Sequence, residues 1–222
     1  MSTHTPEELQ RMYGVRFSSN LEYRKQVWSV LIPDWFGKYI NPADAVLDLG
    51  CGYGEFINGV ACREKYGMDL NPDASRFLHP SVKLIAQDCS SPWPLPDASL
   101  DVVFTSNFFE HLPDKAALGR TLDEIGRCLR PGGRLVAMGP NIKYLHGAYW
   151  DFWDHYVPIT ETSLQEALTT RGFRVEACIG RFLPYTMATG PRYPLVALRA
   201  YLRLPFAWRF FGKQFLVVGA KQ

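Results

Sequence analysis

The stretch from Val46 to Phe56 reads VLDLGCGYGEF, and it decides how the rest of the chain is interpreted. Its apolar start is typical of a buried strand, and Asp48 is followed by glycines at three alternate positions, 50, 52 and 54. Glycine is needed where the backbone turns sharply and lies against a ligand without Cβ atoms in the way. In open parallel sheets such a ligand binds beyond the carboxyl ends of the strands. We therefore expect a ligand-binding loop between this strand and a helix that begins near Glu55.

The spacing of the glycines distinguishes two classes of ligand. A dinucleotide site uses G-x-G-x-x-G and holds a pyrophosphate at the helix N-terminus. The third glycine of that pattern would fall at position 55, where Glu55 stands and would repel a pyrophosphate. G-x-G-x-G with Asp48 two residues ahead instead suits a ligand that carries an ammonium group. A nucleotide-dependent dehydrogenase is therefore disfavoured, and it would be revealed by tight binding of NAD in calorimetry.

Short apolar runs alternate with helical patterns along the rest of the chain. Residues 21–39 have helical spacing interrupted by Pro33, which predicts a kink or two short helices. A helix is expected over 114–129, stopped by a Pro-Gly-Gly turn at 131–133, and another opens with a capping box at 162–165 and closes at Gly172. Strands are expected at 45–49, 65–68, 82–86, 100–105, 134–138, 173–178 and 215–220. This alternation predicts an α/β fold with a mostly parallel sheet and helices on both faces.

Five motifs occur in a fixed order over residues 45–140. They are DLGCGYG at 48–54, Asp69 at the end of the second strand, Gln87-Asp88-Cys89 after the third, LPDASLDVVFTSNFFEHLPD at 95–114, and CLRPGGRLV at 128–136. Together they resemble the class I (Rossmann-like) SAM-dependent methyltransferases, where SAM is S-adenosyl-L-methionine. The glycine loop alone is weak evidence, whereas the ordered set is specific.

The resemblance implies a doubly wound, seven-stranded sheet whose last strand runs antiparallel. We read the chain as a single methyltransferase domain over 1–222, with a helical cap at 1–40, a Rossmann-like core at 41–180 and a closing strand at 214–222. The family joins its last two strands by a short hairpin, whereas residues 181–213 intervene here. This departure suggests an inserted cap that forms part of the substrate site or a lid.

The resemblance also implies a set of cofactor-binding residues, with SAM as cofactor and S-adenosyl-L-homocysteine as product. Asp48 contacts the ligand or orients the glycine loop, Asp69 binds the ribose or caps a helix, and Asp88 contacts adenine or forms an Asx turn. Arg16, together with Tyr13, resembles residues that fold over the cofactor, with a solvated helix approach as the alternative. The expected cofactor-binding set is Arg16, Asp48, Gly50, Cys51, Gly52, Gly54, Asp69, Leu70, Gln87, Asp88, Cys89, Asn107 and His111.

Two histidines follow strands and are candidate catalytic bases. Methyl transfer needs the nucleophile held close to the methyl carbon, and a hydroxyl acceptor also needs a base. His111 follows the strand at 100–105, where it serves as base or lines the cofactor pocket. His155 follows the strand at 134–138 in an aromatic cluster with carboxylates nearby, which forms a substrate pocket or merely a cap on the sheet; the cluster comprises Tyr149, Trp150, Phe152, Trp153 and Tyr156, with Asp151 and Asp154. We expect no metal, because no ligand pair has the helical i, i+4 spacing.

The functional expectation is methyl transfer to a small-molecule or glycan-like acceptor, at a hydroxyl oxygen. The alternatives are N-methylation of a small amine and a SAM-binding protein without catalysis. Nucleic acid is not expected as a partner, because the net charge is only +2. DNA N-methylation in particular is disfavoured, since Ser-Asn-Phe-Phe at 106–109 replaces the N/D-P-P-Y/F motif.

Charge is unevenly distributed along the chain. Glu176 is the last acidic residue, and the seven basic residues after it leave a net charge of 17 − 22 = −5 on residues 1–176. The basic, aromatic segment 191–213 contacts anionic lipid or a lipid-linked acceptor, binds an anionic substrate, or packs with its arginines reaching solvent. We expect a cytoplasmic protein, because the N-terminus has no apolar signal region, no segment approaches the roughly 18 apolar residues of a membrane span, and the five cysteines are scattered. The oligomeric state stays open.

Overall fold

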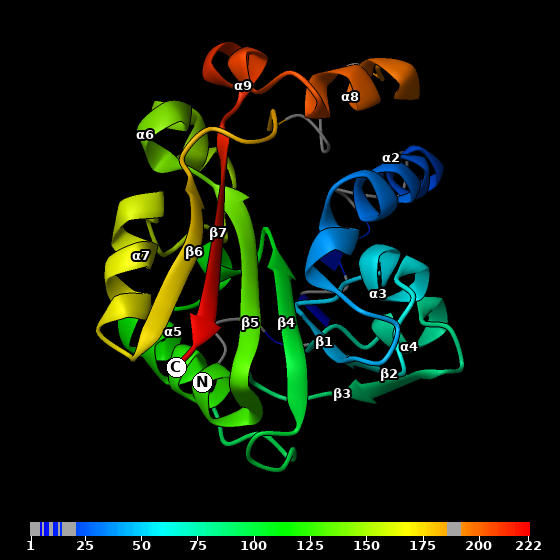
Figure 1. The fold of residues 1–222 in the computed structure, drawn as a ribbon, viewed down its shortest axis with the longest axis vertical. Helices are drawn as coiled ribbons and strands as arrows, with labels where there is room; N and C mark the ends of the chain where they lie inside the picture. The colour runs from blue at the N-terminus through cyan, green and yellow to red at the C-terminus, as the bar shows by residue number, and fades with distance from the viewer. Residues whose placement is uncertain (1–4, 6, 9–10, 13, 15–20, 186–191) are drawn as a thin grey trace.

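Seven strands form one sheet at the centre of the molecule (Figure 1). The structure is a computed structural model, and it describes residues 5, 7–8, 11–12, 14, 21–185 and 192–222. The strands are β1 (Ala45–Leu49), β2 (Glu64–Met68), β3 (Val82–Ile85), β4 (Leu100–Ser106), β5 (Leu129–Pro140), β6 (Phe173–Ile179) and β7 (Gln214–Lys221).

The strand order is β3-β2-β1-β4-β5-β7-β6. Strands β1 to β5 pair in parallel, and β7 runs antiparallel to both β5 and β6. The chain moves outward from β1 to β3 and then returns to the other side of β1, which creates a switch point between β1 and β4. Ligands of open α/β sheets bind at such a point, beyond the carboxyl ends of the strands. The predicted fold class is confirmed.

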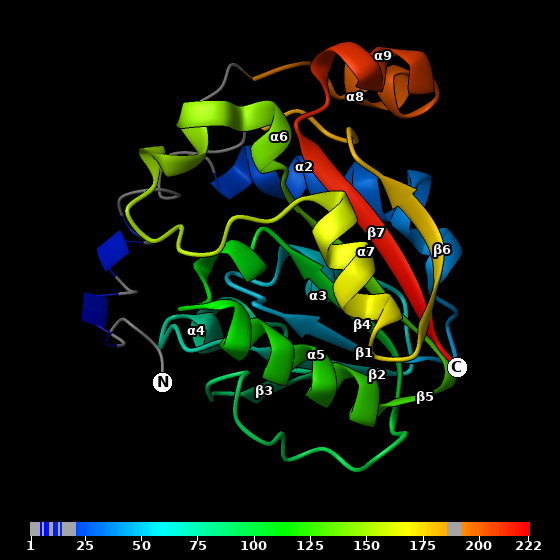
Figure 2. The ribbon, with the colours of Figure 1, turned by 90° about the vertical axis from the view of Figure 1, so that its left-hand side faces the viewer.

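Helices cover both faces of the sheet, as Figures 1 and 2 show. One face packs on α5 (Lys115–Cys128) and α7 (Glu161–Thr169), and the other packs on α2 (Leu21–Asp34) and α3 (Glu55–Gly59). The remaining helices are short: η1 (Phe36–Tyr39), α4 (Ala74–Phe77), η2 (Phe109–His111), α6 (Ile142–Leu145) and η3 (His146–Asp151). The sheet is thus buried on both sides, and the edge at the carboxyl ends of its strands is left for a ligand.

The segment between β6 and β7 contains α8 (Leu195–Leu202) and α9 (Pro205–Phe211). In Figure 1 both helices lie above the sheet, at the end toward which β4 and β5 point. Leu202 and Trp208 anchor them, because both side chains are buried in the same core cluster as α2. Among the helices of the described residues, none is both long and apolar enough to cross a bilayer.

Three local features differ from expectation or refine it. β5 begins at Leu129 rather than at 134, because the Pro-Gly-Gly segment bulges within the strand, with Gly132 at φ +79° and a register shift against β4. The capping box of α7 is formed by Thr160 and Ser163, not by residues 162–165, because these two side chains satisfy each other's backbone N–H groups. Pro33 lies within the last turn of α2, which ends at Asp34, and η1 follows from Phe36, so the run does divide into two helices.

Candidate active site

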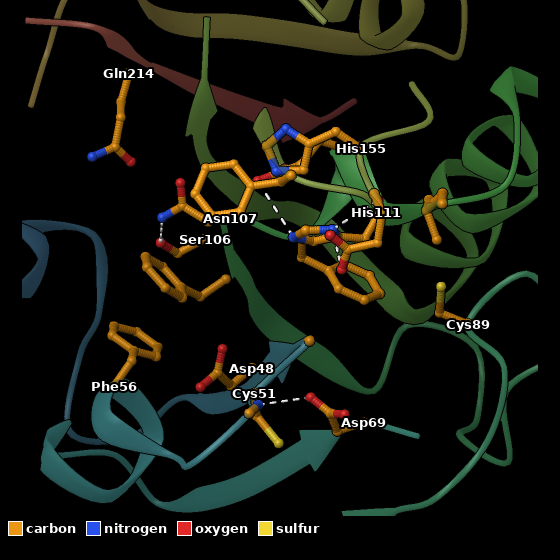
Figure 3. Close-up of a pocket in the computed structure, with 18 of the residues that line it drawn as sticks. Asp48, Cys51, Phe56, Asp69, Cys89, Ser106, Asn107, His111, His155 and Gln214 are labelled. Carbon is orange, nitrogen blue, oxygen red and sulfur yellow. Dashed lines mark hydrogen bonds and ion pairs between the residues drawn. The ribbon is translucent and has the colours of Figure 1, made fainter. Parts of the chain in front are cut away.

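A cavity of about 320 Å³ opens at the carboxyl ends of the parallel strands, next to the switch point. This volume lies within the range of small-molecule and cofactor sites. Figure 3 shows its two sides: Asp48, Cys51 and Asp69 lie at one side, and His111 and His155 lie together at the other. The expected residues that line it are Asp48, Gly50, Cys51, Gly52, Asp69, Leu70, Gln87, Asp88, Cys89, Asn107, His111 and His155.

The loop after β1 depends on its glycines. Gly50 and Gly52 have φ values of +71° and +52°, a region that residues with a Cβ rarely adopt. A Cβ on Gly50 would also lie 2.3 Å from the ring of Phe108. Gly54 differs from the other two: it precedes α3 in the left-handed conformation and packs on Leu78, but it is not among the residues that line the cavity. Its contribution is to turn the chain into α3.

Asp69 holds this loop from the end of β2. Its Oδ2 accepts a hydrogen bond from the Gly52 N–H at 2.7 Å, and its Oδ1 accepts one from the Asn71 N–H at 2.8 Å. Burial raises the pKa of Asp69, and these N–H donors oppose the rise. Asp69 therefore orients the loop through the Gly52 N–H, a role that was considered for Asp48.

Asp48 is a second buried carboxylate beside the loop. Burial raises its pKa well above the usual value, and the nearby charges of Glu55 and Asp69 raise it further, while a backbone hydrogen bond from Ile57 opposes them. Three carboxylates at one side of the cavity create a negative potential. Such a potential suits a ligand with a positive charge.

Arg24 is a cavity residue that the sequence analysis missed. It projects from α2, and its Nε lies 2.9 Å from Oε1 of Glu55, with side chains 14% and 5% exposed. Trp28, one helical turn later, also lines the cavity. The i, i+4 spacing of these two residues on α2 is the signal that could have found the pair. Arg16 and Tyr13, which we expected near the cofactor, lie outside the described residues.

The wall formed after β3 contains the Gln87-Asp88-Cys89 motif. Oδ1 of Asp88 accepts hydrogen bonds from the backbone N–H and the hydroxyl of Ser90, at 2.9 and 2.8 Å. This is the Asx turn that we considered as the alternative, formed while the residue still lines the cavity. Burial acts to raise the pKa of Asp88, but the two bonds from Ser90 lower it overall. Burial also raises the pKa of the Cys89 thiol to about 12.

The opposite wall brings the two histidines together. Nδ1 of His111 lies 3.0 Å from the backbone oxygen and 3.1 Å from Oδ2 of Asp154, and the rings of His111 and His155 are 4.9 Å apart. Nε2 of His111 lies 3.9 Å from Oε1 of the buried Glu110. Burial disfavours the charged ring of His111, but the hydrogen bonds of Asp154 and the charges of both carboxylates raise its pKa overall. Glu110 and Asp154 were not in the expected catalytic set.

His155 lies in the aromatic wall of the cavity. It stacks on Phe152 and forms a T-shaped pair with Tyr149, and the neighbouring Asp154 engages His111. Of the five aromatic residues of the cluster, Phe152 lines the cavity, Tyr149 is buried behind it, and Trp150 and Trp153 are 53% and 84% exposed. The cluster is therefore divided between a buried wall and an exposed surface.

Asn107 completes the wall after β4, at φ +52° and with its Nδ2 donating to the Ser106 hydroxyl at 3.0 Å. The insertion also reaches the cavity, through Tyr185 and Lys213, and Gln214 at the start of β7 lines it next to them. Arg199 does not line the cavity and instead pairs with Asp34 at 3.2 Å. Among residues 181–185 and 192–213, the described part of the inserted segment, Tyr185 and Lys213 face the ligand space.

One group of side chains in the described residues has the composition and spacing of a metal site. The ligand atoms of Glu110, His111 and His155 all lie within 4.8 Å of one another. Our expectation of no metal considered ligand pairs on a single helix. The residues here come from two segments more than 40 positions apart, so helical spacing does not report on them.

The switch point, the glycine loop and the acid at the end of β2 define a Rossmann-like domain that binds a nucleoside-containing cofactor. Residues 47–137 match the family model described as "Methyltransferase domain". The chain is 34% identical over 144 residues to a probable S-adenosylmethionine-dependent methyltransferase of Mycolicibacterium smegmatis, covering 62% of this chain and 54% of that protein. It is 30% identical over 108 residues to 27-O-demethylrifamycin SV methyltransferase of Amycolatopsis mediterranei, and the match covers 44% of this chain and 39% of that protein. The chain thus spans about half, or less, of the length of these relatives.

Solved structures agree on the fold. A SAM-dependent methyltransferase from Archaeoglobus fulgidus superposes with a TM-score of 0.66 at 22% identity, over 89% of this chain and 94% of that one. The family match and the relatives identify the core of this chain as a class I SAM-dependent methyltransferase domain, with SAM as its cofactor. The resemblance of the five ordered motifs is confirmed.

Proposed function

We propose that the protein transfers a methyl group from SAM to a hydroxyl oxygen of a small-molecule or glycan-like acceptor. The observation that carries this proposal is the pair of imidazoles across the cavity from the glycine loop, with Asp154 bonded to one of them. A hydroxyl must lose its proton during methylation, and an imidazole–carboxylate cluster is suited to assist that loss. Such a cluster is not needed for a nucleophile that is already unprotonated.

The cofactor fits the side of the cavity that is formed by the glycine loop. Bare backbone at Gly50 and Gly52 allows close approach, and Asp48 and Asp69 favour the positive charges of the methionyl ammonium and the sulfonium. Arg24, which lines the cavity and pairs with Glu55 just after this loop, could engage the methionyl carboxylate, the role also predicted for Arg16. When bound, SAM supplies an electrophilic methyl group on sulfur.

The acceptor space lies by His111 and His155. We propose that these residues are the catalytic ones, and that Phe152 and Tyr185 hold the acceptor by apolar contact. The protein's contribution is to hold the oxygen about 3–3.5 Å from the methyl carbon and to exclude water. The relative named for 27-O-demethylrifamycin SV carries an oxygen acceptor in its name, which supports the choice of oxygen.

Methylation of a small amine is the second candidate, favoured by the charge of the cavity. Its lining has two basic residues, Arg24 and Lys213, against seven acidic ones, which are Asp48, Glu55, Asp69, Asp88, Glu110, Asp151 and Asp154. A cationic amine would be attracted by this excess. A SAM-binding protein without catalysis is the third candidate, and it predicts cofactor binding with no turnover.

The test has two stages, because cofactor binding and acceptor choice are separate claims. Calorimetric titration with S-adenosylhomocysteine should give one site per chain. SAM labelled in its methyl group, incubated with panels of hydroxylated glycans, phenols and amines, should then yield a labelled ether. Labelled amine alone would support the second candidate, and binding without any labelled product across the panels would support the third. His155→Ala and His111→Gln should lower turnover while His79→Gln, on an exposed histidine, does not.

We also propose that residues 191–213 contact an anionic membrane surface or a lipid-linked acceptor. The described part of this segment exposes Phe206 and Phe210, each 69% exposed, among arginines and without any acidic residue. Apolar side chains inserted among basic ones are typical of interfacial helices. The segment lies at the same end of the sheet as the cavity, so an acceptor held at a membrane would be near the site (Figure 1).

The five cysteines are free thiols, which supports the proposal of a reducing, cytoplasmic environment.

A further inference from the structure

We propose that Glu110, His111 and His155 bind a divalent transition-metal ion at the acceptor side of the cavity. Two imidazole nitrogens and one carboxylate oxygen form the donor set that Zn²⁺, Fe²⁺ and Co²⁺ accept in proteins. The binding of the ion is independent of the proposed function. Its role in the reaction, given below, rests on that function.

The distances between the three residues suit a shared ion. Their ligand atoms lie within 4.8 Å of one another, and Nε2 of His111 is 3.9 Å from Oε1 of Glu110. Ligands that bind one ion at about 2.0–2.2 Å lie roughly 3 Å apart. A movement of about 1 Å or less per side chain therefore closes the site, and rotation about side-chain bonds supplies it.

Asp154 prepares His111 as a ligand. Its carboxylate and its backbone oxygen both face Nδ1 of His111, at 3.1 and 3.0 Å, so Nδ1 carries the proton and donates. Nε2 faces Glu110, and it is the nitrogen that binds the ion once its proton is released. A carboxylate or carbonyl behind a histidine in this way is the usual second partner of a metal-bound imidazole, where it sets the tautomer and the ring orientation.

The backbone holds the two ligand-bearing segments together. The carbonyl oxygen of Glu110 accepts hydrogen bonds from the N–H groups of Tyr156 and Val157, at 2.8 and 3.1 Å. These bonds join η2, with its two ligands, to the loop that carries His155. The site is therefore set by backbone contacts as well as by side chains, and a metal site needs such support to bind tightly.

Charge also favours a cation at this position. Glu110 is 1% exposed and Asp154 is 4% exposed, so two carboxylates are buried within one small cluster. Buried carboxylates are stabilised by paired cations or by coordinated metal ions. A divalent ion would balance the charge of both carboxylates.

The cavity lies on the open side of the three ligands, since all three residues line it. Three protein ligands leave positions for an acceptor oxygen. An ion there polarises the acceptor O–H and lowers its pKa. With both imidazoles bound to the ion, the ion rather than an imidazole base assists the loss of the proton, which passes to water at the mouth of the cavity. The O–H bond breaks, an O–CH₃ bond forms, and the S–CH₃ bond of the cofactor breaks to release S-adenosylhomocysteine. No oxidant or reductant is needed.

The experiment measures metal binding before activity. Protein without a histidine tag is treated with EDTA and dialysed, then titrated with Co²⁺ while the visible d–d absorption is recorded, and with Zn²⁺ by calorimetry. We expect one ion per chain. Glu110→Gln and His155→Ala should weaken binding at least tenfold, and Asp154→Asn, behind His111, should weaken it 10–100-fold. His79→Gln, on an exposed histidine away from the cavity, is the matched control and should not change it.

S-adenosylhomocysteine titration of every variant reports folding of the cofactor side and distinguishes the two proposals. Loss of Co²⁺ binding with retained S-adenosylhomocysteine binding supports the site. Wild-type protein that binds neither ion, or variants that bind as tightly as the wild type, would overturn it. Turnover that EDTA leaves unchanged would overturn the role of the ion in the reaction. Metal binding without S-adenosylhomocysteine binding would support the site and contradict the proposed function.

Discussion

Oδ2 of Asp69, at the end of β2, lies 2.7 Å from the backbone nitrogen of Gly52, in the loop that follows β1. One carboxylate thus orients the loop that faces the cavity and itself lines the same cavity. Structure and binding depend on the same side chain, and substitutions can separate the two contributions.

Removal of the Asp69 carboxylate should affect both stability and binding. Asp69→Ala leaves the buried N–H groups of Gly52 and Asn71 without their acceptors, at a cost of about 1–3 kcal/mol each. Asp69→Asn keeps one acceptor oxygen and should lose less. We expect the free energy of unfolding, measured with urea, to decrease from the wild type to Asp69→Asn and further to Asp69→Ala. Calorimetry should show that Asp69→Ala binds S-adenosylhomocysteine at least tenfold more weakly than the wild type. An alanine variant as stable as the wild type would contradict the assigned hydrogen bonds.

Gly50→Ala should be more harmful than an alanine at another left-handed glycine. Gly50 combines φ +71° with a ring atom of Phe108 at 2.3 Å from the added Cβ, whereas Gly132 has φ +79° and no atom within 4 Å. Both variants carry backbone strain of about 1–2 kcal/mol, and only Gly50→Ala adds overpacking of about 1–3 kcal/mol. Urea unfolding of the two variants measures the difference. If both variants lose the same free energy of unfolding, the ring of Phe108 moves away from the added Cβ at no cost, which would contradict the prediction.

The Arg24–Glu55 pair should behave as a buried ion pair. Arg24→Met leaves the nearly buried carboxylate of Glu55 uncompensated, which costs about 3–5 kcal/mol. Glu55→Gln should destabilise less, because the amide keeps a hydrogen-bond acceptor, and the double variant should recover part of the loss. A double-mutant cycle, with the free energy of unfolding measured in urea, gives the coupling energy between Arg24 and Glu55. If the losses of the two single variants simply add up in the double variant, the two side chains do not interact as a pair. Arg24→Met should also weaken S-adenosylhomocysteine binding if Arg24 engages the carboxylate.

Asp48 should make the protein less stable as the pH rises. Its pKa is raised in the folded protein, so the folded state binds more protons than the unfolded state between the unfolded pKa, near 3.8, and the higher folded pKa. Stability contributed by this residue therefore falls as pH increases through that window. Asp48→Asn should gain stability relative to the wild type at neutral pH, and the gain should shrink toward pH 4. Urea unfolding of both proteins at a series of pH values measures this gain. A difference in unfolding free energy that does not vary with pH would contradict the raised pKa of Asp48.

Exposed phenylalanines of α9 should mediate binding to anionic membranes. Phe206→Ser with Phe210→Ser removes two apolar side chains without changing charge. We expect the wild type to sediment with phosphatidylglycerol vesicles more than with phosphatidylcholine vesicles, and the double variant to sediment less with the anionic ones. Addition of salt should weaken the interaction, because it screens the arginines. Wild-type protein that sediments with neither vesicle would remove the membrane proposal and leave the cavity assignments unchanged.

The sequence alone determined the fold class and the cofactor side of the site. The glycine loop at 50–54 and the acid at 69 lie next to strand ends, and their local geometry is encoded within a few residues of chain. Alternation of apolar runs then predicts the parallel sheet, and the sheet brings these strand ends to one edge. Local errors, such as the start of β5, arose where a bulge replaced the expected turn.

Only the tertiary structure decided which side chains meet at the acceptor side. Asp154 bonds to His111, and ligand atoms of Glu110, His111 and His155 lie within 4.8 Å of one another. Arg24 of α2 also lines the cavity and forms an ion pair with Glu55, directly after the glycine loop. Sequence spacing cannot predict such contacts, because they join segments far apart in the chain. Their geometry depends on how β4, β5 and α2 pack on the sheet, and that packing is a property of the whole core.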